Sequence, residues 1–196
     1  MINDKIHNTI QEHNGIITTE QIESKGISKT AFYNYIREFQ LLKLYRGIYA
    51  TPEAWIDNSY VLSLRCPEII YSHEEALYLH GLAEQEPLIH TVTVKTGYNP
   101  SHLSGNDCKV YTIKKELYDM GKTELQSTFG NILPVYDLDR TICDIVRSRS
   151  NIELQDFQSA LKGYAASSNK NLNNLMKYAE KLGIAKLMRH YMEVLL

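Results

Sequence analysis

Three aspartates near residue 140 form the densest group of side chains with catalytic potential in this 196-residue chain. Asp137 and Asp139 are separated by one residue, and Asp144 follows a little later. Carboxylates at this spacing could hold Mg²⁺. The first two also stand where a helix is expected to begin, and carboxylates there cap free N–H groups. Asp144 can pair with Arg140 or Arg147. We favour the structural interpretation and predict no metal and no cofactor.

Two histidines offer a poorer metal pattern. His73 and His80 are seven residues apart, whereas two histidines that share a metal on one helix face usually stand four apart. We expect both to be structural. The sequence also lacks the phosphate loops GxxxxGK and GxGxxG and the catalytic motifs GxSxG and HExxH. These observations predict that the protein is not an enzyme.

A second set of residues has the chemistry of nucleic-acid binding. Between residues 25 and 46 the only acid is Glu38, although the whole chain has a net charge of -2. The bases in this segment are Lys25, Lys29, Arg37, Lys43 and Arg46. Such a local positive excess is typical of a small DNA-contacting surface on an otherwise neutral protein. A solvated charged face is the alternative, so the expected elements must decide.

The elements expected around these bases begin with short helices. Isoleucines at a spacing of four within residues 2–10 mark a first helix that should end near Asn14-Gly15. Thr18 and Gln21 form a capping box that starts a second helix. The link over residues 26–28 contains glycine and has the length of a helix-turn-helix turn.

The third helix, expected over residues 29–40 after a Ser28 cap, has two faces. Phe32, Ile36 and Phe39 follow helical spacing and should pack inward. The other face carries the polar residues Lys29, Thr30, Tyr33, Asn34 and Arg37. A recognition helix needs such a face, because it supplies hydrogen bonds to base edges and cations to phosphates. The Ser28 cap and the helix dipole also favour a nearby phosphate.

Two strand-like runs, 42–45 and 48–50, follow the third helix and surround Arg46-Gly47. They predict a two-stranded wing, with Lys43 and Arg46 placed to hold the DNA backbone or minor groove. We therefore predict a winged helix-turn-helix DNA-binding domain over residues 1–52.

Residues 57–196 are expected to form a second domain, with the boundary between Pro52 and Asp57. Four strands are expected, over residues 91–95, 109–113, 125–129 and 132–136. A loop over 99–106 separates the first two, and a turn at Gly130-Asn131 joins the last two.

Helices are expected after a Ser72 cap, with Glu75 completing a capping box, and later over residues 140–147, 153–166, 172–182 and 184–195. Gly183 should stop the helix before it. The fold class is therefore α+β: an N-terminal winged helix-turn-helix followed by a C-terminal domain with a small sheet and a helical C-terminal half.

The composition, with 43% hydrophobic and 22% charged residues, excludes collagen-like, disordered and membrane classes. No apolar run approaches the ~18 residues of a membrane span, and the first residues lack the apolar segment of a secretory signal. Cys66, Cys108 and Cys143 are far apart and match neither a disulfide framework nor a CxxC site. We expect a cytoplasmic protein with no membrane contact.

Two segments resemble a known family. The wing sequence LYRGIY at 44–49 and the stretch YDLDRTICDIVR at 136–147 are similar to the AbiEi antitoxins of bacterial abortive-infection systems, which are type IV toxin–antitoxin modules. The resemblance covers nearly the whole chain, and DRTICD at 139–144 is its more distinctive part.

The resemblance implies an antitoxin that is also a transcriptional autorepressor in phage resistance. The N-terminal domain would bind inverted repeats in the operon promoter. The C-terminal domain would neutralise a nucleotidyltransferase-like toxin without forming a stable complex with it. The family offers no catalytic residues to carry over.

On this interpretation the polar face of the third helix enters the major groove, and Ser28 caps that helix and contacts a phosphate. Lys43 and Arg46 contact the DNA through the wing. No heptad pattern is present, so we expect a monomer in solution that pairs on DNA. Two alternatives stay open: a ligand-responsive winged-helix regulator, and a metal-dependent nuclease that uses Asp137, Asp139 and Asp144.

Overall fold

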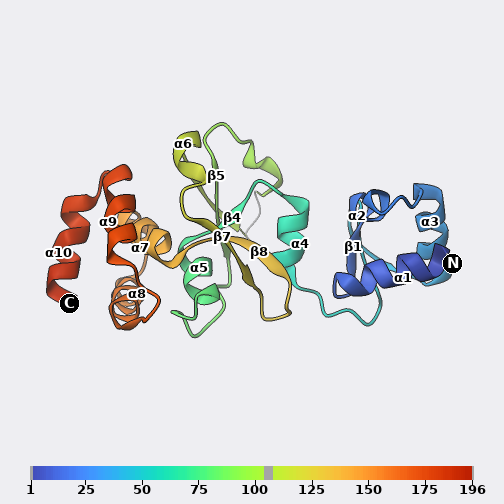
Figure 1. The fold of residues 1–196 in the computed structure, drawn as a ribbon, viewed down its shortest axis with the longest axis horizontal. Helices are drawn as coiled ribbons and strands as arrows, with labels where there is room; N and C mark the ends of the chain where they lie inside the picture. Colours follow the sequence, from blue (N-terminus) through green and yellow to red (C-terminus); the bar gives the residue numbers. More distant parts are fainter. Residues whose placement is uncertain (1, 104–107, 196) are drawn as a thin grey trace. The chain divides into compact units, whose positions relative to one another are not determined.

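A computed structural model describes residues 2–103 and 108–195 (Figure 1). The predicted loop over 99–106 lies in part outside the described residues. The chain divides into two compact units: an N-terminal unit of Met1–Pro67 with Gln126–Leu133, and a C-terminal unit of Glu68–Leu125 with Pro134–Leu196. The N-terminal unit therefore contains the whole predicted domain 1–52, a further segment up to Pro67, and the tip of a distant hairpin.

The N-terminal unit has the expected order of helices and wing. Its elements are α1 (Ile2–Glu12), β1 (Ile16–Thr18), α2 (Thr19–Ser24), α3 (Lys29–Glu38), β2 (Leu42–Tyr45), β3 (Ile48–Ala50) and α4 (Asn58–Arg65). The predicted capping box is present, since the Thr18 side chain accepts from the Gln21 backbone and the Gln21 side chain accepts from the Thr18 backbone. Ser28 caps α3 through a hydrogen bond from the N–H of Ala31.

The wing sheet has three strands rather than the two that the sequence predicts. β3 lies in the centre and pairs antiparallel with β1 and with β2. In β1, Ile16 lies opposite Ala50, and both are fully buried. The extra strand joins the wing to the helices, because it runs directly into α2.

The core of the N-terminal unit includes Ile6, Ile10 and Phe32, all fully buried. One part of the predicted helix face is wrong. Phe39 is 45% exposed, and Tyr35 takes the inward position at 3% exposure. The reason is that α3 ends at Glu38, so Phe39 is already its C-cap residue. Its ring stacks on the Tyr35 ring, with centroids 4.2 Å apart.

Asp57 ties the hairpin tip to the N-terminal unit. It caps α4 by accepting from the N–H of Tyr60, and its other carboxylate oxygen accepts from Ser127 and from the amide of Asn131. The Asn131 side chain also accepts a hydrogen bond from Asn14. Side chains more than 70 residues apart in sequence thus meet around one carboxylate that is 2% exposed.

The C-terminal unit is built on a five-stranded sheet with the order β6-β5-β4-β8-β7. The strands are β4 (Ile70–Tyr71), β5 (His90–Lys95), β6 (Cys108–Ile113), β7 (Lys122–Gln126) and β8 (Ile132–Tyr136). β5 pairs parallel with β6 and antiparallel with β4, and β4 pairs parallel with β8. The strand predicted at 125–129 begins three residues earlier, so the turn after it is longer than the expected pair.

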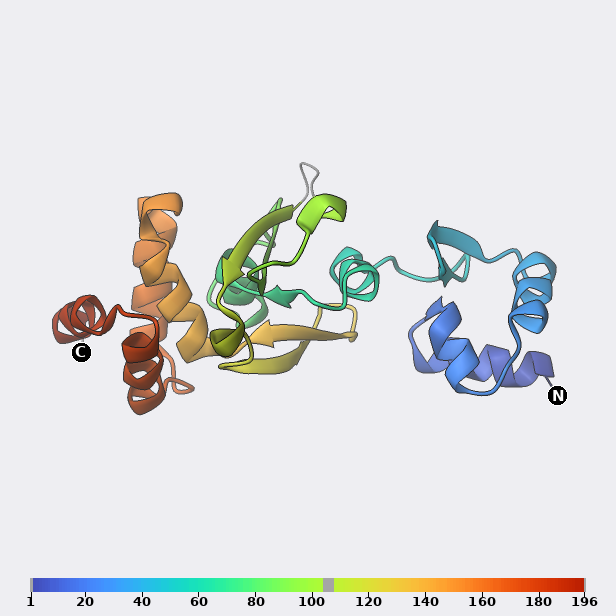
Figure 2. The same ribbon diagram turned by 90° about the horizontal axis from the view of Figure 1, so that it is seen from above.

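The helices of this unit are α5 (His73–Leu79), α6 (Lys115–Tyr118), α7 (Leu138–Arg147), α8 (Leu154–Ala166), α9 (Leu172–Lys181) and α10 (Ala185–Leu195), with short 3₁₀ turns η1 (Pro100–His102) and η2 (Arg149–Asn151). Both views show α7 to α10 grouped beside the sheet (Figures 1 and 2). The buried side chains of α7 include Ile142, Ile145 and Val146. Gly183 has φ +73° between α9 and α10 and is the predicted helix stop.

The predicted capping box at Ser72 is wrong. Ser72 is the N-cap residue of α5, but its side chain makes no capping hydrogen bond. The N–H of Glu75 donates instead to the hydroxyl of Thr91, at 2.8 Å. The Ser72 hydroxyl bonds to the His73 ring and accepts from Thr93. The reason is that β5 lies beside the start of α5 and brings its own hydroxyls to that helix end. Within the described part of the chain, no helix is long and apolar enough to cross a membrane.

Candidate nucleic-acid interface

The outer face of α3 presents side chains suited to reading DNA. All five polar residues predicted for this face are exposed: Lys29, Thr30, Tyr33, Asn34 and Arg37. The ring of Tyr33 is 44% exposed. The face is held outward because Phe32 and Tyr35, on the opposite side of the helix, are buried in the core.

Arg37 is fixed on this face by a neighbour. Its guanidinium donates a 2.6 Å hydrogen bond to the side-chain oxygen of Asn34, one turn earlier. This bond uses one of the five N–H donors of the guanidinium and leaves the others for a partner. An arginine held in place in this way can bond to guanine O6 and N7 or to a phosphate.

The positive charge of this segment is partly balanced by acids that precede it. Lys25 pairs with Glu12 at 3.1 Å, and Lys29 pairs with Glu23 at 3.4 Å. Counting acids only within residues 25–46 overlooked both. Across the described residues, no acid pairs with the remaining three bases of the segment, which are Arg37, Lys43 and Arg46. These three cations of the segment are therefore not neutralised by an acidic partner and can contact phosphates.

The wing places Lys43 and Arg46 in solvent, as its sequence predicts. The turn between its strands needs Gly47, which has φ +77°, a backbone conformation that favours glycine. The carbonyl of Gly47 accepts from the N–H of Thr19, at 2.9 Å, so the turn rests on the first residue of α2.

Sequence reasoning missed one further cation near the wing. The guanidinium of Arg65, on α4, lies 4.7 Å from the centre of the Tyr45 ring, and Tyr45 is 45% exposed. A cation–π pair of this kind joins α4 to the wing. Neither residue stood out in the sequence, because the contact joins β2 to a helix that was not predicted.

The aspartates of α7 have structural partners. Asp137 caps α7 by accepting from the N–H of Arg140 and also accepts from the hydroxyl of Tyr178. Asp139 accepts from the hydroxyl of Tyr164 and from the N–H of Asn171. Burial raises the pKa of the Asp137 carboxyl, against the lowering effect of the hydrogen bonds that it accepts. The two carboxylates thus join α7 to α8 and to α9.

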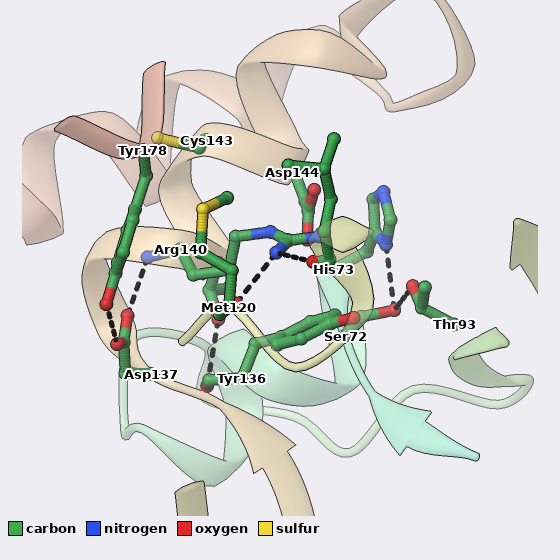
Figure 3. A network of polar contacts seen from close by, with 12 residues as sticks. Ser72, His73, Thr93, Met120, Tyr136, Asp137, Arg140, Cys143, Asp144 and Tyr178 are labelled. Atoms are coloured by element: carbon green, nitrogen blue, oxygen red, sulfur yellow. Dashed lines mark hydrogen bonds and ion pairs between the residues drawn. The ribbon is translucent and has the colours of Figure 1, made fainter. Parts of the chain in front are cut away.

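Arg140 is the centre of this polar cluster (Figure 3). It is fully buried, and its guanidinium lies 4.1 Å from the centre of the Tyr136 ring. Its Nε donates to Asp144 at 3.0 Å, and its Nη1 donates to the carbonyls of Leu117 and Met120. Burial raises the pKa of the Asp144 carboxyl, and the neighbouring charge of Arg140 offsets only part of that rise.

The second terminal nitrogen of Arg140, Nη2, is buried without a hydrogen-bond partner among the described residues. An unsatisfied buried donor costs about 1–3 kcal/mol, and more when the group is charged.

Within the same described ranges, no three His, Cys, Asp or Glu side chains gather closely enough to hold a metal ion.

His73 is buried beside this cluster in a strained conformation. Its φ of +53° lies in the left-handed region, which costs on the order of 1–3 kcal/mol for a residue other than glycine. The ring stacks on Tyr111, with centroids 3.5 Å apart, and its two nitrogens bond to the hydroxyls of Ser72 and Ser148. Burial, followed by the charges of Lys109 and two arginines of α7, lowers the pKa of His73 to about 3. The ring is therefore neutral at physiological pH.

His80, the second histidine of the weak metal pattern, has a different partner. Its Nε2 bonds to the carbonyl of Tyr136 at 2.8 Å. The two histidines therefore have different hydrogen-bond partners, all within the C-terminal unit.

A polar cavity of about 200 Å³ opens next to His73. Residues from α5, β5, β6 and α7 line it, together with the turn after α7. The lining residues are His73, Thr93, Tyr111, Thr112, Ile113, Arg140, Asp144, Arg147, Ser148 and Asn151. This cavity could not be predicted from the sequence, because its walls come from segments up to 78 residues apart, as with His73 and Asn151.

Comparison with known protein families finds a match to the first part of the N-terminal unit. Residues 5–52 match the family model described as "Transcriptional regulator, AbiEi antitoxin". The resemblance found in the sequence is confirmed over this segment, which extends from α1 to the end of the wing. No curated protein matches the chain.

The fold as a whole is similar to a solved structure. The crystal structure of the RV2827C protein from Mycobacterium tuberculosis aligns with a TM-score of 0.64 at 13% identity. The alignment covers 96% of this chain and 75% of the other. At this identity the likeness confirms the fold, including the α+β class predicted for the chain.

Proposed function

We propose that this chain, whose residues 5–52 match the family model of AbiEi antitoxin transcriptional regulators, represses its own operon and neutralises the toxin encoded with it. The winged helix binds inverted repeats in the promoter. The C-terminal unit neutralises a nucleotidyltransferase-like toxin without a stable complex. The protein acts in the cytoplasm, as a monomer that pairs on its DNA site.

The observation that carries the DNA-binding part is the exposed face of α3. Lys29, Thr30, Tyr33, Asn34 and Arg37 are all accessible, and Arg37 is oriented by Asn34. In the proposed complex these side chains enter the major groove. The cap residue Ser28, at the start of the helix, contacts a phosphate, and the wing bases Lys43 and Arg46 contact the backbone or the minor groove.

Replacing Arg37 by alanine tests this proposal. If Arg37 reads a base, the R37A variant loses about 1–3 kcal/mol of binding to the promoter repeats and much less to a scrambled duplex. The matched control is R149A, since Arg149 is an exposed arginine of the C-terminal unit. Titrations of fluorescent duplexes at several salt concentrations measure both. Equal affinity of R37A and the unaltered protein for the repeats would contradict base readout by α3.

A ligand-responsive regulator is a second candidate, and the polar cavity in the C-terminal unit favours it. A small molecule bound there would control the affinity for DNA. The experiment is to repeat the duplex titration with candidate ligands present. A change in affinity would support the sensor function.

The nuclease alternative finds less support. Asp137 and Asp139 accept hydrogen bonds from neighbouring helices, and Asp144 pairs with a buried arginine. A metal would have to displace these partners. Cleavage of DNA by the purified protein in Mg²⁺, lost on D139N substitution, would restore the nuclease hypothesis.

A further inference from the structure

We propose that the cavity beside His73 binds a small oxyanion, namely phosphate or the phosphate group of a small metabolite. The site is formed by Arg140 and Arg147 of α7 and by Tyr111 of β6. This inference is independent of the proposed DNA binding, because it concerns only the C-terminal unit.

One guanidinium nitrogen of Arg140 has no hydrogen-bond partner among the described residues. Nε and Nη1 of its guanidinium are occupied by Asp144 and by two backbone carbonyls. Nη2 is the nitrogen left over, and it is buried without a partner among the described residues. A buried guanidinium N–H pair is a strong donor to an oxyanion, and arginine is the residue that most often recognises phosphate.

The charged side chains around the cavity leave an excess of positive charge. Two bases line it, against the single acid Asp144, which is already paired with Arg140 at 3.0 Å. Arg147 is exposed and makes no hydrogen bond or ion pair within the described residues. Nearby, Lys109 is paired with Glu74. One positive charge therefore has no counterpart on the wall, and an anion would supply it.

The cavity wall also offers a neutral hydrogen-bond donor. The hydroxyl of Tyr111 is buried without a hydrogen-bond partner in the described parts of the chain. Two other hydroxyls on the cavity wall already have partners, since Thr93 donates to Ser72 and Ser148 bonds to the His73 ring. An oxyanion has several acceptor oxygens, so it can satisfy the Tyr111 hydroxyl and Arg140 Nη2 together, whereas an apolar ligand would satisfy neither.

Size limits the ligand. At about 200 Å³ the cavity is smaller than the roughly 300–1,000 Å³ typical of pockets for drug-sized molecules. It fits a tetrahedral oxyanion and not a whole nucleotide. A phosphate monoester would leave its organic part at the opening, beside the exposed Arg147.

The test is titration of the full chain with inorganic phosphate, sulfate and AMP, followed by calorimetry and by backbone amide NMR shifts. We expect saturable binding of phosphate and sulfate, with shifts gathered in residues 109–113 and 144–151. The R147Q variant should bind at least about tenfold more weakly, the loss expected for one charge-assisted hydrogen bond. The matched control R149Q should bind like the unaltered protein, since Arg149 does not line the cavity.

The outcomes separate the possible ligands. If AMP binds and competes with phosphate, a phosphate ester is the ligand; if only the inorganic ions bind, it is a free oxyanion. Absence of saturable binding by all three anions would overturn the proposal. Equal binding by R147Q and R149Q, or shifts confined to residues 2–52, would overturn it as well. R147Q changes an exposed side chain, so loss of folding does not confuse the result.

Discussion

Two arginines of this protein show how burial decides what a side chain does. Arg37 on α3 is exposed and makes one hydrogen bond, to its neighbour Asn34. Arg140 on α7 is fully buried and donates to Asp144 and to the carbonyls of Leu117, in α6, and of Met120, just after it. The first keeps most of its donors for a partner molecule. The second spends most of them on holding the C-terminal unit together.

We expect the largest loss of stability on replacing Arg140. The R140A variant leaves Asp144 as an uncompensated buried carboxylate, and removing one partner of such a pair costs about 3–5 kcal/mol. We expect the free energy of unfolding to fall by that amount in chemical denaturation. The matched change at the exposed arginine, R37A, should lower it by less than about 0.5 kcal/mol. Equal losses at both positions would contradict the structural role assigned to the buried arginine.

The buried side chain of His73 gives the next largest expected effect, which is on the pH dependence of stability. Its pKa of about 3 means that the folded protein resists protonation of His73, whereas the unfolded chain protonates near 6.5. Below pH 6.5 the unfolded state therefore binds more protons, and stability falls as the pH falls. Between pH 7 and pH 5 this amounts to about 2 kcal/mol, at 1.36 kcal/mol for each pH unit below 6.5.

Replacement of His73 by asparagine isolates this contribution. Asparagine tolerates the left-handed backbone at this position and does not titrate. The H73N variant should lose less stability than the unaltered protein between pH 7 and pH 5, whatever its stability at pH 7. If the unfolding free energies of H73N and of the unaltered protein had the same pH dependence in denaturant melts, His73 would not be a buried, neutral group.

A smaller effect, on DNA affinity rather than on stability, is expected from the wing. Arg46 is exposed at the wing tip and has no acidic partner among the described residues. If it contacts a phosphate, R46A weakens binding to all duplexes alike and reduces the salt slope by about 1. Affinities for promoter repeats and scrambled DNA across a salt series measure this. A loss restricted to the promoter repeats would instead make Arg46 a base-reading residue.

The smallest effect is expected at Asp139. The D139N variant keeps an acceptor oxygen for Tyr164 and for the N–H of Asn171. Stability should fall by no more than about 1 kcal/mol, and toxin neutralisation should be retained. Loss of neutralisation at normal thermal stability would give Asp139 a role beyond joining helices and would favour the enzyme alternative.

The features best predicted from the sequence are those that depend on local interactions. The capping box of Thr18 with Gln21, the Ser28 cap and the stop at Gly183 each depend on neighbours within a few residues, and all three are present. The five polar residues of α3 are exposed for the same reason, since helical spacing sorts the two faces. Their contact with DNA stays a prediction.

Contacts distant in sequence account for what was missed. The two-residue strand β4 exists only through its pairing with β5 and β8. The Ser72 capping box fails because Thr91, 16 residues beyond Glu75, supplies the acceptor in its place. The cavity and its unpaired arginine nitrogen arise in the same way, from β5, β6 and α7 meeting in the fold.

The most direct test of the account uses the double variant Y33A/R37A in two assays. A promoter–reporter assay measures repression, and growth rescue from the co-expressed toxin measures neutralisation. Both side chains are exposed on α3, so the fold should be kept. We expect the double variant to lose repression and to retain rescue at normal protein level. Loss of rescue as complete as the loss of repression would contradict the assignment of DNA reading to α3 and of neutralisation to the C-terminal unit.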